Sequence, residues 1–577
     1  MTSERVQIQK RIRIRQAAAQ DHLPDSLSPL LRRIYLNRGV GDASQLDLGL
    51  ASLLSFHSLK GIAAATELLV QAIEQDWHIL VVGDFDADGA TSTALAHTAL
   101  TRFGATRVSY IVPDRFRFGY GLTPEIVALA AEQKPDLIIT VDNGISSIEG
   151  VEAARRAGIR VLITDHHLPG SELPAAEAIV NPNQPGCDFP SKVLAGVGVI
   201  FYVMAALRAE LRRRGSISDE ITLGDLLDLV ALGTVADVVP LDYNNRILVQ
   251  QGLQRIRAGR ARPGVLALCR ISGRDVSSMG AMELGFFIGP RLNAAGRLED
   301  MSIGIECLLG QSDDAAMALA QRLDDLNAQR REIQEQMQQD AEFLLRKHGP
   351  AGKQQFSLCL FDPEWHEGVV GLVASRIKER YHRPSIAFAP SGESGVLKGS
   401  ARSIPGLHIR DVLDAVAARH PGLISKFGGH AMAAGLSLQA DQLEAFGAAF
   451  EEEVRGLLRE DDLEPVVESD GELAGNELTL EAAELIATAG PWGQRFPQPV
   501  FHGRFEVAES RIVGGRHLKL SLRREGGNGL IDCIAFNSGE MKERVSRGVL
   551  LAYRPEVNEY MGRRSLQLVA EHIEPVS

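Results

Sequence analysis

Between residues 60 and 240, short apolar runs alternate with helix-forming stretches, and this alternation narrows the possible folds more than any other feature. HILVVGDFD precedes GATSTALAHTALTRFG, VSYIVPDRF precedes TPEIVALAAEQ, DLIITVDNGIS precedes SIEGVEAARRAG, and IRVLITDHH leads to a loop. Continuous apolar runs are typical of parallel strands that are buried on both faces and joined by helices. We therefore predict an α/β domain with a doubly wound parallel sheet.

The rest of the chain predicts three further parts. Residues 315–347 contain neither Gly nor Pro and few apolar residues, which indicates a long, solvent-exposed connecting helix or, alternatively, a surface helix of the first domain. A smaller α/β unit follows, and four stretches after residue 516 alternate polar and apolar residues as in a small antiparallel barrel. The predicted divisions are 1–310, 311–348, 349–455 and 456–577.

The charge and the cysteines limit the class of protein. The net charge is −13, but residues 451–500 hold 13 acidic and only 3 basic residues, so basic surfaces that bind nucleic acid remain possible elsewhere. We expect the acidic stretch to be a flexible hinge or a docking surface.

The five cysteines are scattered without a C-x-x-C pair, which favours buried thiols in a reducing compartment: Cys187, Cys269, Cys307, Cys359 and Cys533.

The sequence shows no segment that predicts export or membrane insertion. The basic N-terminus, MTSERVQIQKRIRIRQ, lacks the apolar core of a secretion signal. The longest apolar run, residues 193–207, is shorter than the roughly 18–20 residues of a membrane span and predicts a buried helix. We expect a cytoplasmic protein that does not bind a membrane.

Acidic and imidazole side chains gather where the predicted strands end. Ligands of open parallel sheets bind beyond the carboxyl ends of the strands, so these segments should meet in one crevice. One Asp at a strand end is usually a helix cap or a turn residue, but caps do not explain an Asp or His in four separate segments. We predict a metal site from Asp84, Asp86, Asp88, Asp142, Asp165, His166, His167 and Asp237.

The donor types indicate which metal this site would hold. Carboxylates with one or two imidazoles and no thiolate favour Mn²⁺, with Mg²⁺ as the alternative, over zinc. Five or six ligands suit two ions about 3.5–4 Å apart with one bridging carboxylate. Two cations would offset the repulsion among the three clustered acids. Such a pair polarises a phosphoryl oxygen and makes hydroxide from bound water near neutral pH.

Four motifs, GDFDADG, TVDNG, DHH and GTVADVVP, resemble the metal-binding motifs of the DHH phosphoesterase superfamily. Longer stretches resemble the RecJ family of exonucleases through nearly the whole chain: VLAGVGVIFY, GPRLNAAGR, WHEGVVGLVASR, KGSARS and KFGGHAMAAG. The resemblance implies a DHH catalytic domain, a DHH-associated domain and an OB fold. It also implies 5′→3′ degradation of single-stranded DNA to 5′-mononucleotides in recombination and mismatch repair, by a monomer that works with single-strand-binding protein and recombination helicases.

The resemblance also implies roles for the residues of the metal site. The two ions would be held by Asp86, Asp88, Asp142, His166 and Asp237, with Asp142 as the bridge. Asp84 would be either a ligand or a partner of one. Asp165 would orient an imidazole, and His167 would meet the substrate phosphate or the leaving oxygen.

Other residues are candidates for holding the DNA strand. KGSARS and FGGH place Lys398, Ser400, Arg402 and Ser403, and Gly428, Gly429 and His430, beside glycines that let backbone N–H groups approach a phosphate. Such glycines alone would indicate only tight turns. Arg402 and Ser400 are predicted to contact the 5′-terminal phosphate. Further candidates are Arg291, Asn293 and Arg297 near the connecting helix, and Tyr120, which would stack on a base or simply pack.

The barrel offers weaker candidates for binding a single strand. Basic residues lie on or beside one of its predicted strands, namely Arg516, His517, Lys519, Arg523 and Arg524, although such a run is usually a solvated face. Four aromatic residues are candidates either for stacking on bases or for the barrel core: Phe501, Phe505, Tyr553 and Tyr560.

Two other functions compete with the nuclease. A small-molecule DHH phosphoesterase would share the metal motifs, but such chains are much shorter and lack the terminal barrel. A non-catalytic scaffold with the same fold would have lost metal carboxylates, and all of them are present here. Turnover of pyrophosphate, dinucleotides and a long single strand would separate these alternatives.

Overall fold

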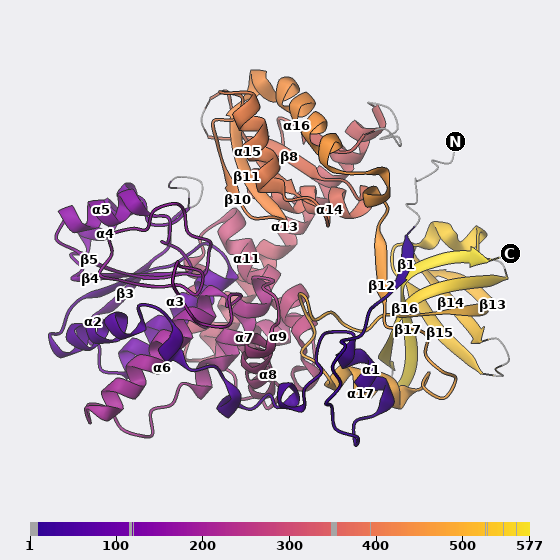
Figure 1. The fold of residues 1–577 in the computed structure, drawn as a ribbon, viewed down its shortest axis with the longest axis horizontal. Helices are drawn as coiled ribbons and strands as arrows, with labels where there is room; N and C mark the ends of the chain where they lie inside the picture. The colour runs from indigo at the N-terminus through magenta and orange to yellow at the C-terminus, as the bar shows by residue number, and fades with distance from the viewer. Residues whose placement is uncertain are drawn as a thin grey trace.

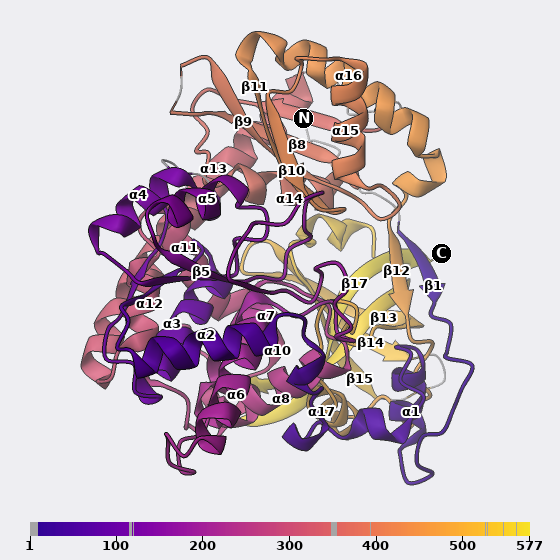
Figure 2. The ribbon, with the colours of Figure 1, turned by 60° about the vertical axis from the view of Figure 1, so that its left-hand side comes forward.

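The protein consists of three folded parts that are joined by a long helix and by the N-terminal segment (Figure 1). The computed structural model describes residues 10–114, 118, 120–347, 355–392, 394–524, 527, 529–545, 547–560 and 562–576. In Figure 2 the second domain lies above the sheet of the first domain, and the barrel lies beside both.

The first domain contains a five-stranded parallel sheet with the strand order β3-β2-β4-β5-β6. Its strands are β2 (Ile79–Val82), β3 (Val108–Ile111), β4 (Leu137–Val141), β5 (Arg160–Thr164) and β6 (Ala178–Val180). The order runs in opposite directions on the two sides of the β2–β4 pair, which is the topological switch point of a doubly wound sheet. The predicted parallel sheet is therefore confirmed.

Helices cover both faces of this sheet, which explains the continuous apolar strand sequences. On one face, α2 (Ile62–Glu74), α3 (Ala87–Arg102) and α6 (Gly196–Arg213) pack on side chains such as Val81 and Ile139. On the other face, α4 (Pro124–Glu132) and α5 (Ile148–Arg156) pack on side chains such as Leu80 and Ile138. The apolar run at 193–207 falls largely in α6, which is buried as predicted.

A helical extension links the sheet to the second domain. It comprises α7 (Leu227–Ala236), α8 (Tyr243–Arg257), α9 (Pro263–Ile271), α10 (Ala281–Glu283), α11 (Gly289–Leu298) and α12 (Ser302–Leu309). The long helix α13 (Asp313–Lys347) follows. Its Ala316, Ala320 and Leu323 belong to the core of the first domain, whereas Met337 and Ala341 belong to that of the second. The helix connects the domains as predicted, but one stripe of it is buried in both cores rather than exposed to solvent.

The second domain is a mixed sheet between helices, with the strand order β10-β11-β9-β8-β7. Its strands are β7 (Leu358–Phe361), β8 (Ser385–Pro390), β9 (Val396–Arg402), β10 (Lys426–Gly429) and β11 (Ala433–Gln439). Helix α14 (Val370–Tyr381) packs with the end of α13 on one face. Helices α15 (Ile409–Arg419) and α16 (Leu443–Leu457) cover the other face.

The C-terminal part is a closed five-stranded barrel with the order β13-β14-β15-β17-β16. Its strands are β13 (Phe501–Val513), β14 (His517–Arg524), β15 (Leu530–Ala535), β16 (Gly548–Tyr560) and β17 (Arg563–Val576). The barrel fold was predicted, but β13 was not, and the β15–β17 pair that closes the barrel is parallel rather than antiparallel. The first strand was missed because it lacks a strict two-residue period, and the direction of the closing pair was missed because periodicity does not tell which strands pair or in which direction.

The acidic stretch binds the chain's own N-terminal segment. Strand β1 (Arg11–Ile14) pairs in parallel with β12 (Val466–Ser469), and Arg11 and Arg13 form ion pairs with Glu464 and Glu468. Helix α1 (Pro29–Leu36) contacts the segment that contains α17 (Leu480–Thr488), because the hydroxyl of Tyr35 donates to the carbonyl of Ala489 at 2.9 Å. The acidic stretch is thus a docking surface for the chain's own N-terminal segment, and its role as a hinge stays a prediction.

One buried ion pair fastens this junction. Arg38 donates to the two carboxylate oxygens of Asp470 at 2.8 and 3.0 Å, and the two side chains are 1% and 0% exposed. Asn37 donates to the same carboxylate at 3.0 Å. From here the N-terminal segment continues into the first domain, so it connects the region beside the barrel with the domain of the parallel sheet (Figure 1).

Among the described residues, no single helix has the length and apolar character of a membrane span. One bent pair, Leu50–Ser58 with Ile62–Glu74, meets the length and composition criteria only when the two are taken together.

Candidate metal centre

The predicted metal residues meet beyond the carboxyl ends of β2, β4 and β5. Asp84 follows β2, Asp86 caps the N-terminus of α3 by accepting from the N–H groups of Asp88 and Gly89, and Asp88 lies in the first turn of that helix. Asp142 follows β4, His166 and His167 follow β5, and Asp237 caps the C-terminus of α7. The cluster therefore sits at the switch point of the sheet, as the sequence predicted.

Three overlapping groups of side chains bring their donor atoms within 4.8 Å of one another. They share members and so form one continuous cluster: Asp84–Asp86–Asp142, Asp142–His166–His167 and Asp88–His166–Asp237. The Nε2 atom of His166 lies 3.1 Å from Oδ1 of Asp142 and 3.6 Å from Oδ2 of Asp237. All seven predicted side chains other than Asp165 are thus close enough to act on shared cations.

The central atoms of the cluster are buried and make no hydrogen bond to any described residue. They are Asp142 Oδ1, His166 Nε2 and Asp237 Oδ2, and they face one another at 3.1 and 3.6 Å. Buried polar atoms are almost always satisfied, and these three come from separate segments and converge on one place. Their oxygen and imidazole donors fit a hard or borderline divalent cation such as Mn²⁺ or Mg²⁺.

The crowding of acids shifts their protonation. Burial and the neighbouring Asp237 raise the pKa of Asp88 to about 7. Burial and Asp86 raise the pKa of Asp237 to about 8, and burial with the charges of Asp88 and Asp86 raises that of Asp142 well above its usual range. Without a cation the cluster therefore holds protons near neutral pH, because several ionised carboxylates cannot share a buried site.

The first turn of α6 fixes the carboxylate of Asp88. The N–H groups of Gly196 and Val197 donate to its two oxygens at 2.6 and 2.9 Å, where the positive end of the helix favours a negative charge. A Cβ on Gly196 would lie 2.5 Å from Cβ of Asp142, so only glycine lets α6 approach the cluster this closely. The sequence analysis did not identify this helix terminus.

Asp165 orients His167 rather than His166. Its Oδ1 accepts from Nδ1 of His167 at 2.7 Å, and its Oδ2 accepts from the N–H of Ile145 at 2.9 Å. Burial opposes the charge of Asp165, but the hydrogen bond and positive charge of His167 hold its pKa at about 2. Burial likewise opposes the charge of His167, but the contact with Asp165 raises its pKa to about 9.

Two asparagines that the sequence analysis missed hold the DHH loop in place. Asn181 and Asn183 follow β6 and donate to the backbone carbonyls of His167 and His166 at 2.9 and 2.6 Å. The signal for them was the NPNQPG stretch at the end of a strand. It was overlooked because β6 is only three residues long.

Tyr120 and the second domain complete the surroundings of the cluster. The hydroxyl of Tyr120 donates to the carbonyl of Asp142 at 3.1 Å and lies 3.0 Å from Nδ1 of His167. From the second domain, the ring of His430 stacks on that of His167 with centroids 5.7 Å apart. The glycines of β10 precede His430, and a Cβ on Gly428 would meet no atom within 4 Å. The metal cluster therefore lies where the two domains meet.

Ser400 and Arg402 lie on β9 beside the N-terminus of α14. A Cβ on Gly371, in the first turn of this helix, would lie 2.7 Å from Nη2 of Arg402 and 3.3 Å from Oγ of Ser400. Arg402 is partly buried, donates to Ser375 Oγ at 3.1 Å and forms no ion pair among the described residues. The neighbouring Lys398 pairs with Glu367 at 2.9 Å, and Ser403 is buried and bonded to backbone carbonyls.

The three candidates near the connecting helix have structural contacts. Arg291 is 8% exposed, pairs with Asp324 of α13 at 2.8 Å and donates to the carbonyl of Phe287. Asn293 accepts from the N–H of Ala87 at 2.7 Å, next to Asp86 and Asp88, and therefore supports the metal loop. Arg297 donates to the carbonyl of Gly368 at 3.1 Å and links α11 to the second domain. The DNA contact of Arg291 stays a prediction, and in the structure its charge is buried and paired with Asp324.

The barrel candidates lie away from the metal cluster, on the other side of the molecule (Figure 1). Lys519 on β14 pairs with Asp532 at 2.9 Å, and Arg516 lies in the turn before that strand. Phe501, Phe505 and Tyr553 are 0–5% exposed, so they belong to the core and are not stacking platforms. Tyr560, at 67% exposed, is the one of the four that is accessible.

Family models match each of the three folded parts. The DHH family N-terminal domain matches residues 78–234, the DHHA1 domain matches 354–456, and the RecJ OB domain matches 469–572. The first match contains every residue of the metal cluster except Asp237.

Relatives match the chain over nearly its full length. The chain is 55% identical to the single-stranded-DNA-specific exonuclease RecJ of Dickeya dadantii, over 97% of this chain and 99% of that protein. Crystal structures of Thermus thermophilus RecJ in complex with Mn²⁺ and with Mg²⁺ match with TM-scores of 0.80 and 0.74 at 32% and 30% identity. These matches cover 96% of this chain and 76% and 75% of the solved chains. The chain thus belongs to the RecJ family of single-stranded-DNA-specific exonucleases.

Proposed function

We propose that the protein is a metal-dependent exonuclease that degrades single-stranded DNA from its 5′ end and releases 5′-mononucleotides. The observation that carries this proposal is the convergence of unpaired carboxylate and imidazole atoms from Asp142, His166 and Asp237 at the switch point. Full-length similarity to RecJ exonucleases supports the choice of DNA over a small phosphorylated molecule.

Two divalent cations, Mn²⁺ first and Mg²⁺ as the alternative, would be held by Asp86, Asp88, Asp142, His166 and Asp237. Asp142 is the candidate bridge, because it belongs to two of the three donor groups. Asp84 shares one group with Asp86 and Asp142, which makes it a further ligand or a partner of one. When bound, such ions polarise the scissile phosphate and provide a hydroxide near neutral pH.

The remaining groups position the reacting phosphate. Asp165 holds the ring of His167 in one orientation, so that its Nε2 faces the place of the substrate phosphate or the leaving 3′ oxygen. The hydroxyl of Tyr120 lies 3.0 Å from the same Nδ1 of His167, and the residue is 47% exposed, which leaves it able to contact a base. His430 covers this imidazole from the second domain and limits the access of water.

The 5′-terminal phosphate would bind between β9 and the N-terminus of α14. This helix has no side-chain cap, and although the N–H groups of Val370 and Leu372 donate to the carbonyls of His366 and Val369, its positive dipole end favours an anion beside Gly371. Arg402 carries a charge without an ion-pair partner among the described residues, and Ser400 adds a hydroxyl beside it. Gly428, on the edge strand β10, has open space beside its Cα and offers a second place for the strand, whereas Gly429 is packed against Ala433 and Ala434.

The larger arrangement is consistent with a preference for single strands. The second domain lies above the sheet of the first domain and the barrel lies beside both (Figure 2), and we propose that together they admit a single strand more readily than a duplex. We propose that Arg516, Lys519 and the exposed Tyr560 of the barrel contact the strand farther from the cut. We also propose that the functional domains are 1–310, 311–348, 349–455 and 456–577, and that Arg297 serves the joint between the first and second domains. We further propose that the protein is a cytoplasmic monomer that works with single-strand-binding protein and recombination helicases.

One experiment separates the nuclease from its two rivals. A 5′-labelled single strand, a 3′-labelled single strand, the matching duplex, a dinucleotide and pyrophosphate are each incubated with Mn²⁺ and either the wild type or Asp142→Ala. We expect labelled mononucleotide to appear first from the 5′-labelled single strand, with the variant inactive. Faster turnover of the dinucleotide or pyrophosphate would favour a small-molecule phosphoesterase, and no Mn²⁺-dependent turnover at all would favour a scaffold.

A further inference from the structure

A second charged cavity lies at the junction of three segments far from one another in the sequence. Its volume is about 390 Å³, and its walls come from the N-terminal segment, the loops before α6 and α8, and the loop after α17. The residues that matter are Arg38, Lys192, Asp242, Arg246, Arg495 and Phe496. The members of the metal cluster do not line it.

Arg246 is the unusual residue of this cavity. Its side chain lies on α8, is 4% exposed and forms no ion pair among the described residues. Its Nε is buried and unpaired, and its one hydrogen bond is a long contact of 3.4 Å from Nη1 to the carbonyl of Gln45. The guanidinium instead lies over the rings of Phe496 and Tyr243, with 4.4 and 5.6 Å to the centroids. A buried cation without a counter-ion is costly, and this one faces a cavity.

The other charged groups of the cavity do not neutralise Arg246. Arg38 is already paired with Asp470, and Nζ of Lys192 donates to the carbonyls of Pro182 and Cys187. Arg495 is exposed and has no ion pair among the described residues. The single carboxylate, Asp242, attracts the charge of Arg246 without forming an ion pair with it among the described residues, and it caps α8 by accepting from the N–H of Asn245 at 2.8 Å. The cavity wall therefore carries more positive than negative charge.

We propose that this cavity is an anion site that binds a phosphate group, either on a free mononucleotide or in a DNA strand. Arg246 and Arg495 would bind the phosphate oxygens, since a guanidinium offers paired donors in the geometry of a phosphate. The volume is within the range of small-molecule sites, and the aromatic rings give a nucleotide an apolar wall. Occupancy would hold the N-terminal segment against the first domain, because residues of both line the cavity.

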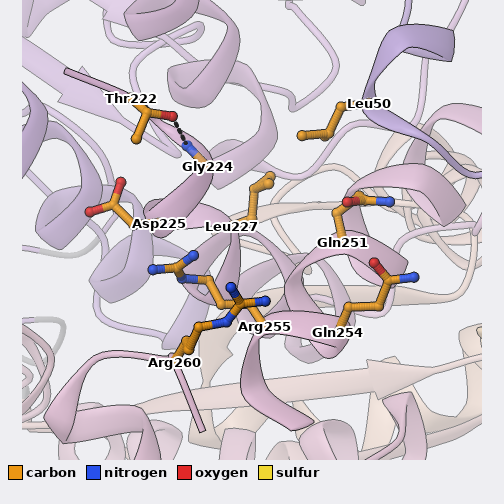
Figure 3. A pocket seen from close by; sticks show the side chains of 9 residues that line it. All are labelled: Leu50, Thr222, Gly224, Asp225, Leu227, Gln251, Gln254, Arg255 and Arg260. Atoms are coloured by element: carbon orange, nitrogen blue, oxygen red, sulfur yellow. Dashed lines mark hydrogen bonds between the residues drawn. The ribbon is translucent and has the colours of Figure 1, made fainter. Parts of the chain in front are cut away.

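Another cavity provides a matched control (Figure 3). It has a volume of about 310 Å³, and the guanidinium groups of Arg255 and Arg260 lie close together in it, with Asp225 nearby. Arg260 is exposed, whereas Arg255 is partly buried and its Nε also lacks a hydrogen-bond partner among the described residues, so Arg260 is the residue that serves as the control. Both cavities carry arginines, and only the first holds one that is buried without an ion pair among the described residues.

The test measures phosphate binding to the full chain in EDTA, so that the metal centre does not contribute. Isothermal titration with dTMP, inorganic phosphate and an eight-residue oligothymidylate is performed on Arg402→Ala, which removes the candidate site for the 5′-terminal phosphate; dTMP and inorganic phosphate decide the result, because the oligonucleotide also has candidate contacts on the barrel. The comparison adds Arg495→Ala, Arg246→Gln or the control Arg260→Ala to this background. Arg495 is exposed, so its replacement tests the site even if Arg246→Gln does not fold.

We expect Arg495→Ala and Arg246→Gln to weaken binding about tenfold or more, as loss of a charge-assisted phosphate contact does, and Arg260→Ala to leave it unchanged. If these two replacements weaken the binding of dTMP, the cavity is a mononucleotide site. If they weaken only the binding of the oligonucleotide, the cavity contacts the DNA strand. The proposal is overturned if no anion binds in the Arg402→Ala background. It is equally overturned if binding persists unchanged in Arg495→Ala.

Discussion

Replacing Arg402 with alanine tests how the 5′ end of the strand is held. The guanidinium lies over the first turn of α14 and has no ion-pair partner among the described residues, so its charge is free for a phosphate. A hydrogen bond to a charged group contributes about 1.5–3 kcal/mol, which corresponds to a roughly 10- to 150-fold loss in kcat/KM. We therefore expect a loss of this size on 5′-phosphorylated single strands.

The assay compares 5′-phosphorylated and 5′-hydroxyl strands of the same sequence. The hydroxyl strand lacks the terminal phosphate, so Arg402→Ala should reduce its cleavage much less. Arg402→Lys keeps the charge but not the paired donors and should recover part of the loss. Arg376→Ala is the matched control, because Arg376 lies on α14 but is 57% exposed and pairs with Glu379. Equal losses on both substrates, with unchanged melting temperature, would refute the assigned contact.

Three further predictions concern the junction, the metal centre and backbone strain. Arg38→Ala leaves the carboxylate of Asp470 buried without its cation, which costs about 3–5 kcal/mol of stability. Amide hydrogen exchange of β1 and β12 should therefore accelerate at least a hundredfold. An unchanged exchange rate would contradict this prediction. The pKa values of Asp88 and Asp237 are raised to about 7 and 8 without metal, so Mn²⁺ must displace protons. Its affinity should rise from pH 6 through pH 8 and level off only where Asp237 is fully ionised. Calorimetry in buffers of different ionisation enthalpy should detect the released protons. Val238, 62% exposed beside the cluster, has a φ of 60°, so Val238→Gly should stabilise the metal-free protein by about 1 kcal/mol in thermal unfolding whereas Val238→Ala should not.

The sequence predicted the elements whose pattern is local. The runs that form β2, β4 and β5 are apolar because both faces of the sheet are covered, and this pattern identified the strands and the positions just after them. The carboxylates and imidazoles at those positions followed from the rule that ligands bind at the carboxyl ends of parallel strands. The metal cluster was therefore predictable from the sequence alone.

The features that depend on distant contacts were not predictable in this way. Strand β1 pairs with β12 more than 450 residues away, and periodicity does not identify a partner strand. Arg291 belongs to the GPRLNAAGR motif and was a candidate for contacting DNA, but the direction of its side chain depends on Asp324 of another helix. The aromatic residues of the barrel alternate like surface residues, and only the closure of the barrel decides that Phe501 and Phe505 are inside.

The central claim is that carboxylates and imidazoles from β2, β4, β5 and α7 share a pair of divalent ions. The most direct measurement is the anomalous difference map of a crystal soaked in Mn²⁺. We predict two peaks about 3.5–4 Å apart, with Asp142 between them and His166 and Asp237 in contact. A map without peaks among these side chains, or with manganese bound elsewhere in the molecule, would contradict the account.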